Sequence, residues 1–150
     1  MQNILITGCS SGIGLQTALT LKDNNYKVYA SAKKIEDVEM LRNLGFETFK
    51  IDVRNKEDIS NALNTILQND KKLDAVFNNA GFGQPGAVED LSVEVLKEQF
   101  ETNFFGLHEV TIQAMKIFRK QGYGKIIQHS SVLGIISLKF RGAYNASKYA

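Results

Sequence analysis

A tyrosine and a lysine near the end of the chain form the pair of side chains best suited to acid–base chemistry. Tyr144 and Lys148 are four residues apart, so on a helix they share a face. A free phenol has a pKa of about 10 and exchanges protons poorly at neutral pH. A neighbouring ammonium group favours the phenolate and lowers that pKa toward the working range. The pair therefore predicts a proton donor and acceptor, although such a pair also occurs by chance on helix surfaces.

A glycine-rich turn near the N-terminus has the composition of a phosphate-binding loop. Residues 7–14, TGCSSGIG, follow a short apolar run and precede an amphipathic segment. Gly8 permits a tight turn, Gly12 lets the backbone approach a phosphate, and Gly14 lets the helix lie close to the sheet. The amides at the helix start attract an anion, which the helix dipole also favours. A glycine turn without a ligand is the alternative, because this signal alone is weak.

Alternating apolar runs and helical patterns position these groups on a sheet. Apolar runs predict strands at residues 4–6, 27–32, 49–53, 75–77 and 125–129. Helical spacing predicts helices between them, with Asn55 capping the third, a long helix over residues 92–120, and a last helix over residues 144–150. Strands that are apolar on both faces indicate an α/β fold with a doubly wound parallel sheet and helices on both faces. Ligands of such sheets bind beyond the carboxyl ends of the strands.

The bulk composition is that of one ordinary globular domain. The chain has 150 residues, of which 43% are hydrophobic and 23% charged, enough for a single core. A net charge of +2 gives no reason to expect nucleic acid or an anionic membrane as a partner, and no apolar run is long enough to span a bilayer. Cys9 is the single cysteine, so we expect no disulfide within the chain and no metal site. No signal-peptide pattern is present, and a reducing, cytoplasmic location fits.

Five ordered motifs resemble those of the short-chain dehydrogenase/reductase family. They are the glycine turn with its spacing of three residues and then one, Asn78–Gly81, Thr102–Gly106, Ser130-Ser131 and Tyr144-x-x-x-Lys148. The motifs run through the whole chain in the family's order, so together they are far more specific than any one alone. The resemblance implies a Rossmann-type sheet and hydride transfer with a nicotinamide cofactor.

The resemblance also assigns roles to the residues of the acid–base pair and their neighbours. It implies that Tyr144 protonates a substrate alkoxide, or takes the alcohol proton in oxidation, and that Lys148 also holds the nicotinamide ribose. It places the serine that holds the substrate oxygen thirteen residues before the tyrosine, at Ser131 rather than Ser130. It further implies that Asn103 anchors a water that leads to Lys148. The alternatives are turn formation for the serines and a hydrogen-bonded structural role for Asn103.

The second predicted strand bears on the choice of cofactor. NAD sites tend to carry an acid about 20 residues after the glycine fingerprint, but here Ala32 is followed by Lys33 and Lys34. A small residue followed by cations accepts a 2′-phosphate, so we predict NADP(H). NAD(H) is the alternative, since Glu36 and Asp37 lie close by and a lysine pair is also ordinary at a helix start. The residues expected to bind the cofactor are Gly8, Ser10, Ser11, Gly12, Ile13, Gly14, Lys33, Asp52, Val53, Asn79, Ala80, Gly81, Tyr144 and Lys148.

We interpret the chain as an NADP(H)-dependent oxidoreductase acting on a small carbonyl or alcohol substrate. The loop Phe82–Gly86 and nearby aromatic residues favour an apolar substrate. The resemblance implies further strands after residue 150, so we expect residues 1–150 to be one domain truncated within the active-site helix, and a homo-oligomer at full length. The alternative is a non-enzymatic nucleotide-binding module or an inactive fragment. His129, alone at a strand end, is interpreted as structural.

Overall fold

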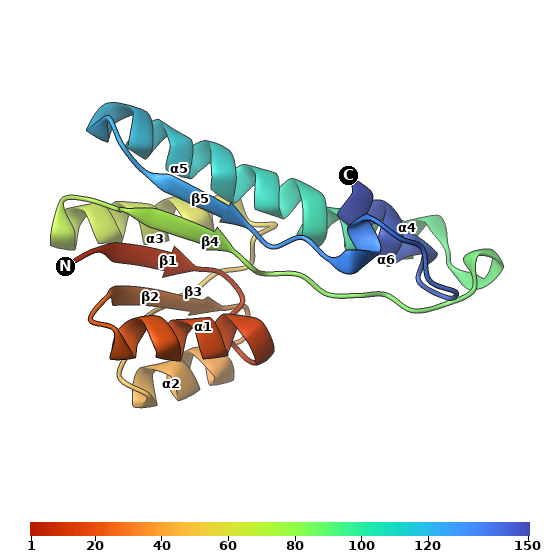
Figure 1. Cartoon of the computed structure of the whole chain (residues 1–150), viewed down its shortest axis with the longest axis horizontal. Coiled ribbons are helices and arrows are strands. Elements are labelled where there is room, and N and C mark those ends of the chain that lie inside the picture. The colour runs from red at the N-terminus through yellow and green to blue at the C-terminus, as the bar shows by residue number, and fades with distance from the viewer.

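Five parallel strands form the centre of the molecule, in the order β3-β2-β1-β4-β5 (Figure 1). The computed structural model describes residues 1–150. The strands are β1 (Asn3–Ile6), β2 (Lys27–Ala32), β3 (Glu47–Lys50), β4 (Ala75–Asn78) and β5 (Lys125–Gln128). The order runs outward from β1 in both directions, which confirms the predicted doubly wound sheet. Because the strands are parallel, their carboxyl ends all meet at one edge.

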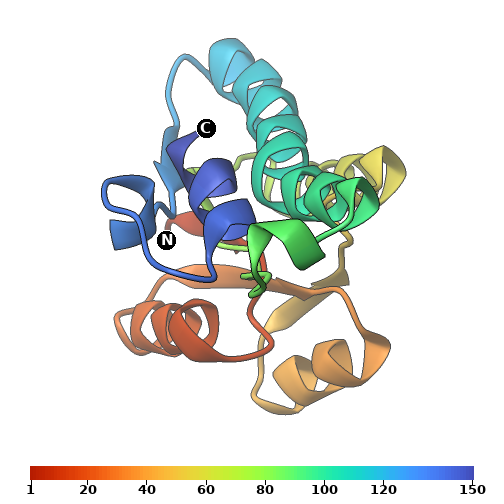
Figure 2. The same cartoon turned by 90° about the vertical axis from the view of Figure 1, so that its right-hand side faces the viewer.

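Helices cover both faces of this sheet (Figure 2). One face carries α1 (Gly12–Asp23) and α2 (Ile35–Asn43), and the other carries α3 (Lys56–Asp70) and α5 (Leu107–Gln121). The remaining helical elements are η1 (Val88–Asp90), α4 (Val93–Phe100), the π-helical η2 (Glu101–Gly106), η3 (Val132–Gly134) and α6 (Gly142–Tyr149). No helix is long and apolar enough to span a bilayer.

The core has two parts because successive side chains of a strand point to opposite faces. Ile4 and Ile6 of β1 pack under α1 and α2, whereas Leu5 packs under α3 and α5. All three are nearly inaccessible to solvent. The start of α3 follows the prediction, since the side chain of Asn55 accepts hydrogen bonds from the first backbone N–H groups of that helix. Local sequence therefore fixes where these elements begin and which side they bury.

The third strand differs from its prediction. The apolar alternation predicts residues 49–53, but β3 covers Glu47–Lys50. Ile51 and Val53 lie after the strand and remain buried, at 4% and 5% exposure. The backbone N–H of Ile51 still donates to the carbonyl of Ala32. These residues keep an apolar alternation because they pack against the core, although only the first of them continues the hydrogen bonding of the sheet.

The long helix over residues 92–120 is present but interrupted. Ser92 caps its start, and α4, η2 and α5 then follow one another without a loop. The six residues of η2 form a π-helical turn within the helix, a feature frequently found at functional sites. The apolar stripe that predicts this helix continues across the π turn, so the sequence pattern gives no sign of it.

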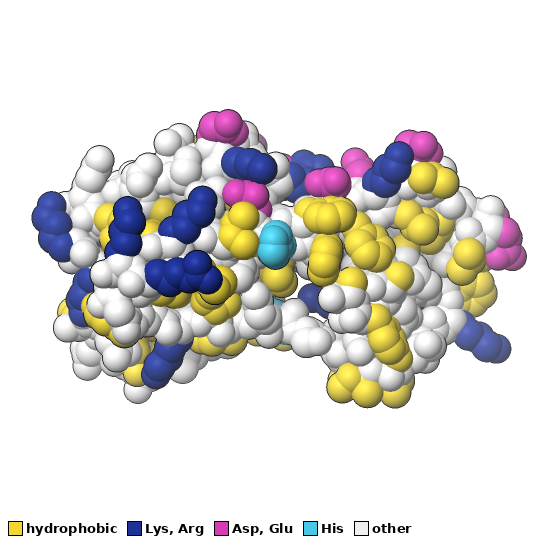
Figure 3. Space-filling view, turned by 90° about the horizontal axis from the view of Figure 1, so that it is seen from above, with side chains coloured by type: hydrophobic (Ala, Val, Ile, Leu, Met, Phe, Trp, Pro, Cys, Tyr) yellow, Lys and Arg dark blue, Asp and Glu magenta, His cyan; other side chains and the backbone are white.

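A lobe extends from the carboxyl edge of the sheet (Figure 1). It consists of α4, α6 and the loops around them, including η1 and η3. Figure 3 views the molecule from the side of α5. Lys and Arg side chains gather over the part that covers the sheet, and hydrophobic side chains gather over the lobe. At the far side of the sheet, β5 is an edge strand with Ile127 49% exposed. The edge of the sheet at β5 is therefore partly open to solvent.

Candidate active site

A cleft of about 630 Å³ lies between the carboxyl edge of the sheet and the lobe. Of the predicted site residues, it is lined by Gly8, Ser10, Ser11, Ile13, Gly14, Lys33, Asp52, Val53, Asn79, Ala80, Gly81, Tyr144 and Lys148. Gly12, Asn103 and Ser131 do not line it. A second cavity of similar volume between α3 and α5 touches none of the predicted residues. The first cleft is the candidate site, because the glycine turn and the acid–base pair meet there.

The glycine turn at one side of the cleft has room for a ligand but not for side chains. Gly8 has a φ of +72°, and a Cβ atom there would lie 2.7 Å from the Cα of Ala80. A Cβ on Gly14 would overlap the Gly8 carbonyl and the side-chain nitrogen of Asn79. The backbone N–H groups of residues 12–14 donate to no protein atom, and the first turn of α1 carries no acid. This arrangement fits an anionic group such as a phosphate.

The acid–base pair lies at the other side of the cleft. The Lys148 ammonium donates to the backbone carbonyl of His129 over 2.8 Å and lies 5.9 Å from the centroid of the Tyr144 ring. Burial lowers the pKa of Lys148, because the charged form is desolvated there. Gly83 lies against the tyrosine ring, and a Cβ on it would be 3.5 Å from ring carbons. The predicted juxtaposition of the two side chains is therefore present, with the tyrosine half-buried in the cleft.

Asn103 lies behind the acid–base pair, on the π turn, and is 4% exposed. Its side-chain oxygen accepts from the Phe82 N–H, and its nitrogen donates to the Phe82 carbonyl and to the Ser147 hydroxyl, at 2.9–3.0 Å. Ser147 in turn donates to the carbonyl of Tyr144. Asn103 therefore joins the loop after β4 to α6. Both amide hydrogens are used, and the proposed water next to this residue stays a prediction.

The serine pair splits between two positions. The Ser131 hydroxyl accepts a hydrogen bond from the Leu133 N–H at the start of η3, over 3.1 Å. Ser130 lines the cleft instead. Ser131 is thus the chain neighbour of a residue that lines the cleft, and the assignment of the substrate oxygen to Ser131 stays a prediction.

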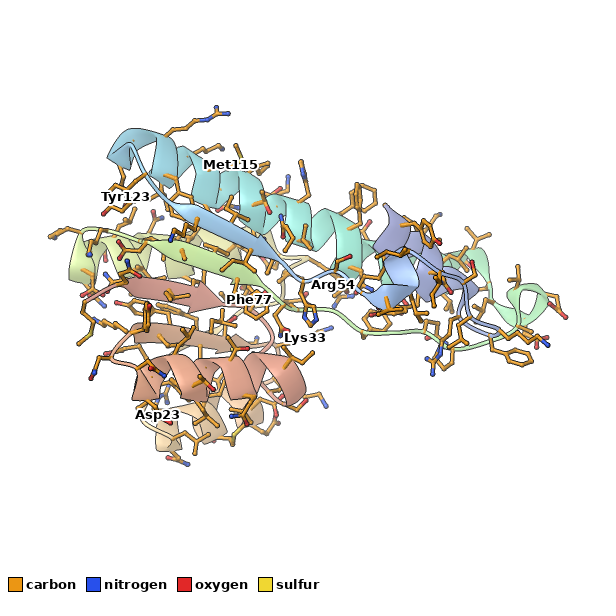
Figure 4. All side chains as sticks on the ribbon, in the orientation of Figure 1. Asp23, Lys33, Arg54, Phe77, Met115 and Tyr123 are labelled. Atoms are coloured by element: carbon orange, nitrogen blue, oxygen red, sulfur yellow. The ribbon has the colours of Figure 1, made fainter.

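A group of charged side chains lies near the carboxyl ends of β2 and β3 (Figure 4). Arg54 forms a bidentate hydrogen bond with Asp52 at 2.6–3.2 Å, and the Lys33 ammonium lies 3.4 Å from the same carboxylate. The Arg54 guanidinium, together with the more distant Lys33, lowers the pKa of Asp52 to about 2. The sequence analysis missed Arg54. Its position two residues after Asp52, in a segment already assigned to the cofactor, was the available signal.

Comparisons with known proteins find sequence relatives along nearly the whole chain. A profile described as short chain dehydrogenase matches residues 2–150. The uncharacterized oxidoreductase YbbO of Escherichia coli is 43% identical over 99% of this chain and 56% of its own length. A 3-ketodihydrosphingosine reductase of Bacteroides thetaiotaomicron is 37% identical over 99% and 54%. The chain thus spans about half the length of the curated relatives it matches.

Solved structures with bound nicotinamide cofactors are also similar. The structure described as ElxO with NADP bound superposes with a TM-score of 0.93 and 26% identity, covering 99% of this chain and 63% of its own. An NAD⁺-bound xylitol dehydrogenase has a TM-score of 0.91 and 27% identity, covering 99% and 60%. The arrangement of sheet, helices and lobe is therefore shared with proteins that bind either cofactor.

Proposed function

Since the chain belongs to the short-chain dehydrogenase family, we propose that it binds NADP(H) in the cleft and interconverts a carbonyl compound and an alcohol. The observation that carries this proposal is the meeting of the glycine turn with Tyr144 and Lys148 in one cleft. The bound nicotinamide supplies or accepts the hydride. The chain provides binding, orientation and the proton.

The roles of the chain's own groups follow from their chemistry. The free N–H groups at the start of α1 bind phosphate oxygens, with the helix dipole in their favour. Lys33 pairs with the 2′-phosphate, which its 61% exposed side chain near Asp52 supports. Tyr144 transfers the proton, and the Lys148 ammonium beside it stabilises the phenolate. Ser131 holds the substrate oxygen, and Asn103 keeps α6 and the loop after β4 in register.

The proposed substrate is apolar. Exposed hydrophobic side chains lie on the lobe that borders the cleft, and Phe82 at the cleft wall is 42% exposed. They include Val88, Val132, Ile135, Ile136, Leu138 and Phe140. The name of the 37% identical relative, a 3-ketodihydrosphingosine reductase, supports a substrate with a large hydrocarbon part. Burying such a part against these side chains contributes about 25 cal/mol per Å² of apolar surface.

The proposal is tested by following NADPH oxidation with a panel of aldehydes and ketones, on the chain as printed and on the full-length gene product. Tyr144→Phe is expected to lose at least about a hundredfold in turnover while still binding NADPH. Tyr123→Phe, at an exposed turn outside the cleft, is the matched control. Full activity of Tyr144→Phe refutes the assignment of the proton donor. NADPH binding without turnover of any carbonyl favours a nucleotide-binding module instead.

A further inference from the structure

We infer that His129 is a positioning residue that holds the glycine turn and the Lys148 ammonium in a fixed relation, acting as a neutral ring with its proton on Nδ1. The inference concerns how the site of the proposed function is built. Only its test by cofactor binding rests on that function. The sequence interpretation of His129 as structural gave it no partner. The structure gives it three hydrogen-bond partners, Asn79 through its side chain and Lys148 and Asn78 through its backbone.

The side chain of His129 reaches the glycine turn through Asn79. The His129 Nδ1 lies 2.8 Å from the side-chain oxygen of Asn79. The side-chain nitrogen of Asn79 donates to the carbonyls of Thr7 and Gly8, at 3.0 and 2.8 Å. These two carbonyls are the first of the turn that the proposed phosphate site depends on. A chain of hydrogen bonds therefore runs from the end of β5 to the glycine turn after β1.

This chain determines which ring nitrogen carries the proton. A side-chain nitrogen that faces two carbonyl oxygens must be the NH₂ end of the Asn79 amide, since a carbonyl oxygen there would face two acceptors. The oxygen of Asn79 then faces the imidazole, so Nδ1 of His129 has to be the donor. The other nitrogen, Nε2, is left without a proton in the neutral ring.

The backbone of His129 holds the other side of the site. Its carbonyl accepts the hydrogen bond from the Lys148 ammonium, and its N–H donates to the carbonyl of Asn78 in β4. His129 thus contacts Lys148 of the acid–base pair directly, and it contacts the glycine turn through the side-chain amide of Asn79.

The surroundings of the ring favour its neutral form. Burial and the positive charge of Lys148 on α6 both lower the pKa of His129. From β4 the ring meets Phe77, whose centroid is 5.8 Å away, and from the loop after β4 it meets Asn79, neither of which titrates. A second positive charge beside Lys148 would be unfavourable without a carboxylate to offset it. The neutral ring with Nδ1 protonated is the form that satisfies every neighbour.

The tautomer provides a test that needs no cofactor. Nitrogen-15 NMR of the imidazole signals at neutral pH is expected to show His129 protonated on Nδ1 and unprotonated on Nε2. The signals are assigned with His129→Asn and with His108→Gln, which removes the chain's other histidine. A ring protonated on Nε2 alone, or a charged ring at pH 7, overturns the inference.

A pair of variants then tests the positioning role. His129→Asn places an amide N–H close to the position of Nδ1, whereas His129→Leu has a similar shape and no donor. Fluorescence titration with NADPH is expected to show a dissociation constant about tenfold larger than that of the wild-type chain for the leucine variant. For the asparagine variant the dissociation constant should stay within about twofold of the wild-type value. Equal affinity of the two variants overturns the inference. If the wild-type chain binds no NADPH, the proposed function fails, and the NMR measurement still decides the tautomer.

Discussion

The two ends of the candidate cleft are built from different interactions. At one end, Asp52, Arg54 and Lys33 form ion pairs whose side chains are 23–61% exposed. At the other end, Asn103 and Ser147 are 4% and 3% exposed, and their amide and hydroxyl groups pair with one another and with the backbone. We call these the charged end and the amide end.

The difference shows how one site combines rigidity with adjustable recognition. At the amide end each buried polar atom costs about 1–3 kcal/mol if it loses its partner, so the geometry there has few alternatives. At the charged end water and salt screen the ion pairs, and an exposed pair contributes about 0–1 kcal/mol. The acid–base chemistry that we propose needs fixed positions, and we assign it to the amide end. The proposed discrimination between cofactors needs only a change of charge, and we assign it to the charged end.

The largest expected effect comes from the lysine at the amide end. Lys148→Met removes the ammonium beside Tyr144 and leaves the His129 carbonyl without its donor. We expect kcat/KM for carbonyl reduction to fall about a thousandfold, measured on the full-length gene product with NADPH. Lys120→Met, on the exposed end of α5, is the control. A loss of kcat/KM of less than about tenfold would contradict the proposed role of Lys148 in proton transfer.

The next effect concerns stability at the same end. Asn103→Leu leaves the Phe82 N–H without its acceptor and removes one of the two donors to the Phe82 carbonyl, which keeps its hydrogen bond from Gln99. The free energy of unfolding is therefore expected to fall by about 2 kcal/mol. Urea unfolding measures this loss. Asn61→Leu on the exposed side of α3 should change the same quantity by less than about 0.5 kcal/mol. Similar losses for both variants would mean that the amide network is not what stabilises this end.

A charge reversal at the charged end should alter cofactor affinity more than stability. Lys33→Glu places a negative charge where we propose the 2′-phosphate, so NADPH is expected to bind about tenfold more weakly. NADH affinity should stay within about twofold, because NADH has no phosphate there. Raising the salt concentration to about 0.5 M should shrink the NADPH effect, since the group is exposed. An equal loss for the two cofactors would contradict the assignment of Lys33.

The smallest effect is expected from the ion pair between Asp52 and Arg54. Arg54→Met should lower the free energy of unfolding at pH 7 by less than about 1 kcal/mol, because solvent screens the pair. The pKa of Asp52 is lowered to about 2 in the folded protein, against about 3.9 unfolded, so the contribution is present above pH 4 and is lost as the pH falls toward 2. Urea unfolding of both proteins across this range checks the trend. A difference that grows as the pH falls would contradict it.

Much of the fold could be predicted because its signals are local. Apolar alternation, the cap at Asn55 and the glycine turn depend on neighbouring residues, and they gave the doubly wound sheet and most of the cleft lining. The predicted strand bounds and site residues were less accurate where contacts between distant residues decide the structure. Ile51 and Val53 alternate like a strand because they pack into the core, although β3 ends at Lys50. Arg54 was missed although it lies two residues after Asp52, because that spacing alone does not show that the guanidinium turns back onto the carboxylate.

The sequence by itself determined which chemistry the chain is equipped for, since a tyrosine and a lysine four residues apart and a glycine turn after a strand carry their physical meaning wherever they occur. Only the tertiary structure decided which side chains hold that chemistry in place. Asn103 bonds to Ser147 forty-four residues away, and His129 bonds to Asn79 fifty residues away. His129 and Asn79 meet because the parallel strands β4 and β5 end at the same edge of the sheet, whereas Asn103 and Ser147 meet where α6 packs against the π turn. No local pattern in the sequence specifies which amide will face which donor at either place.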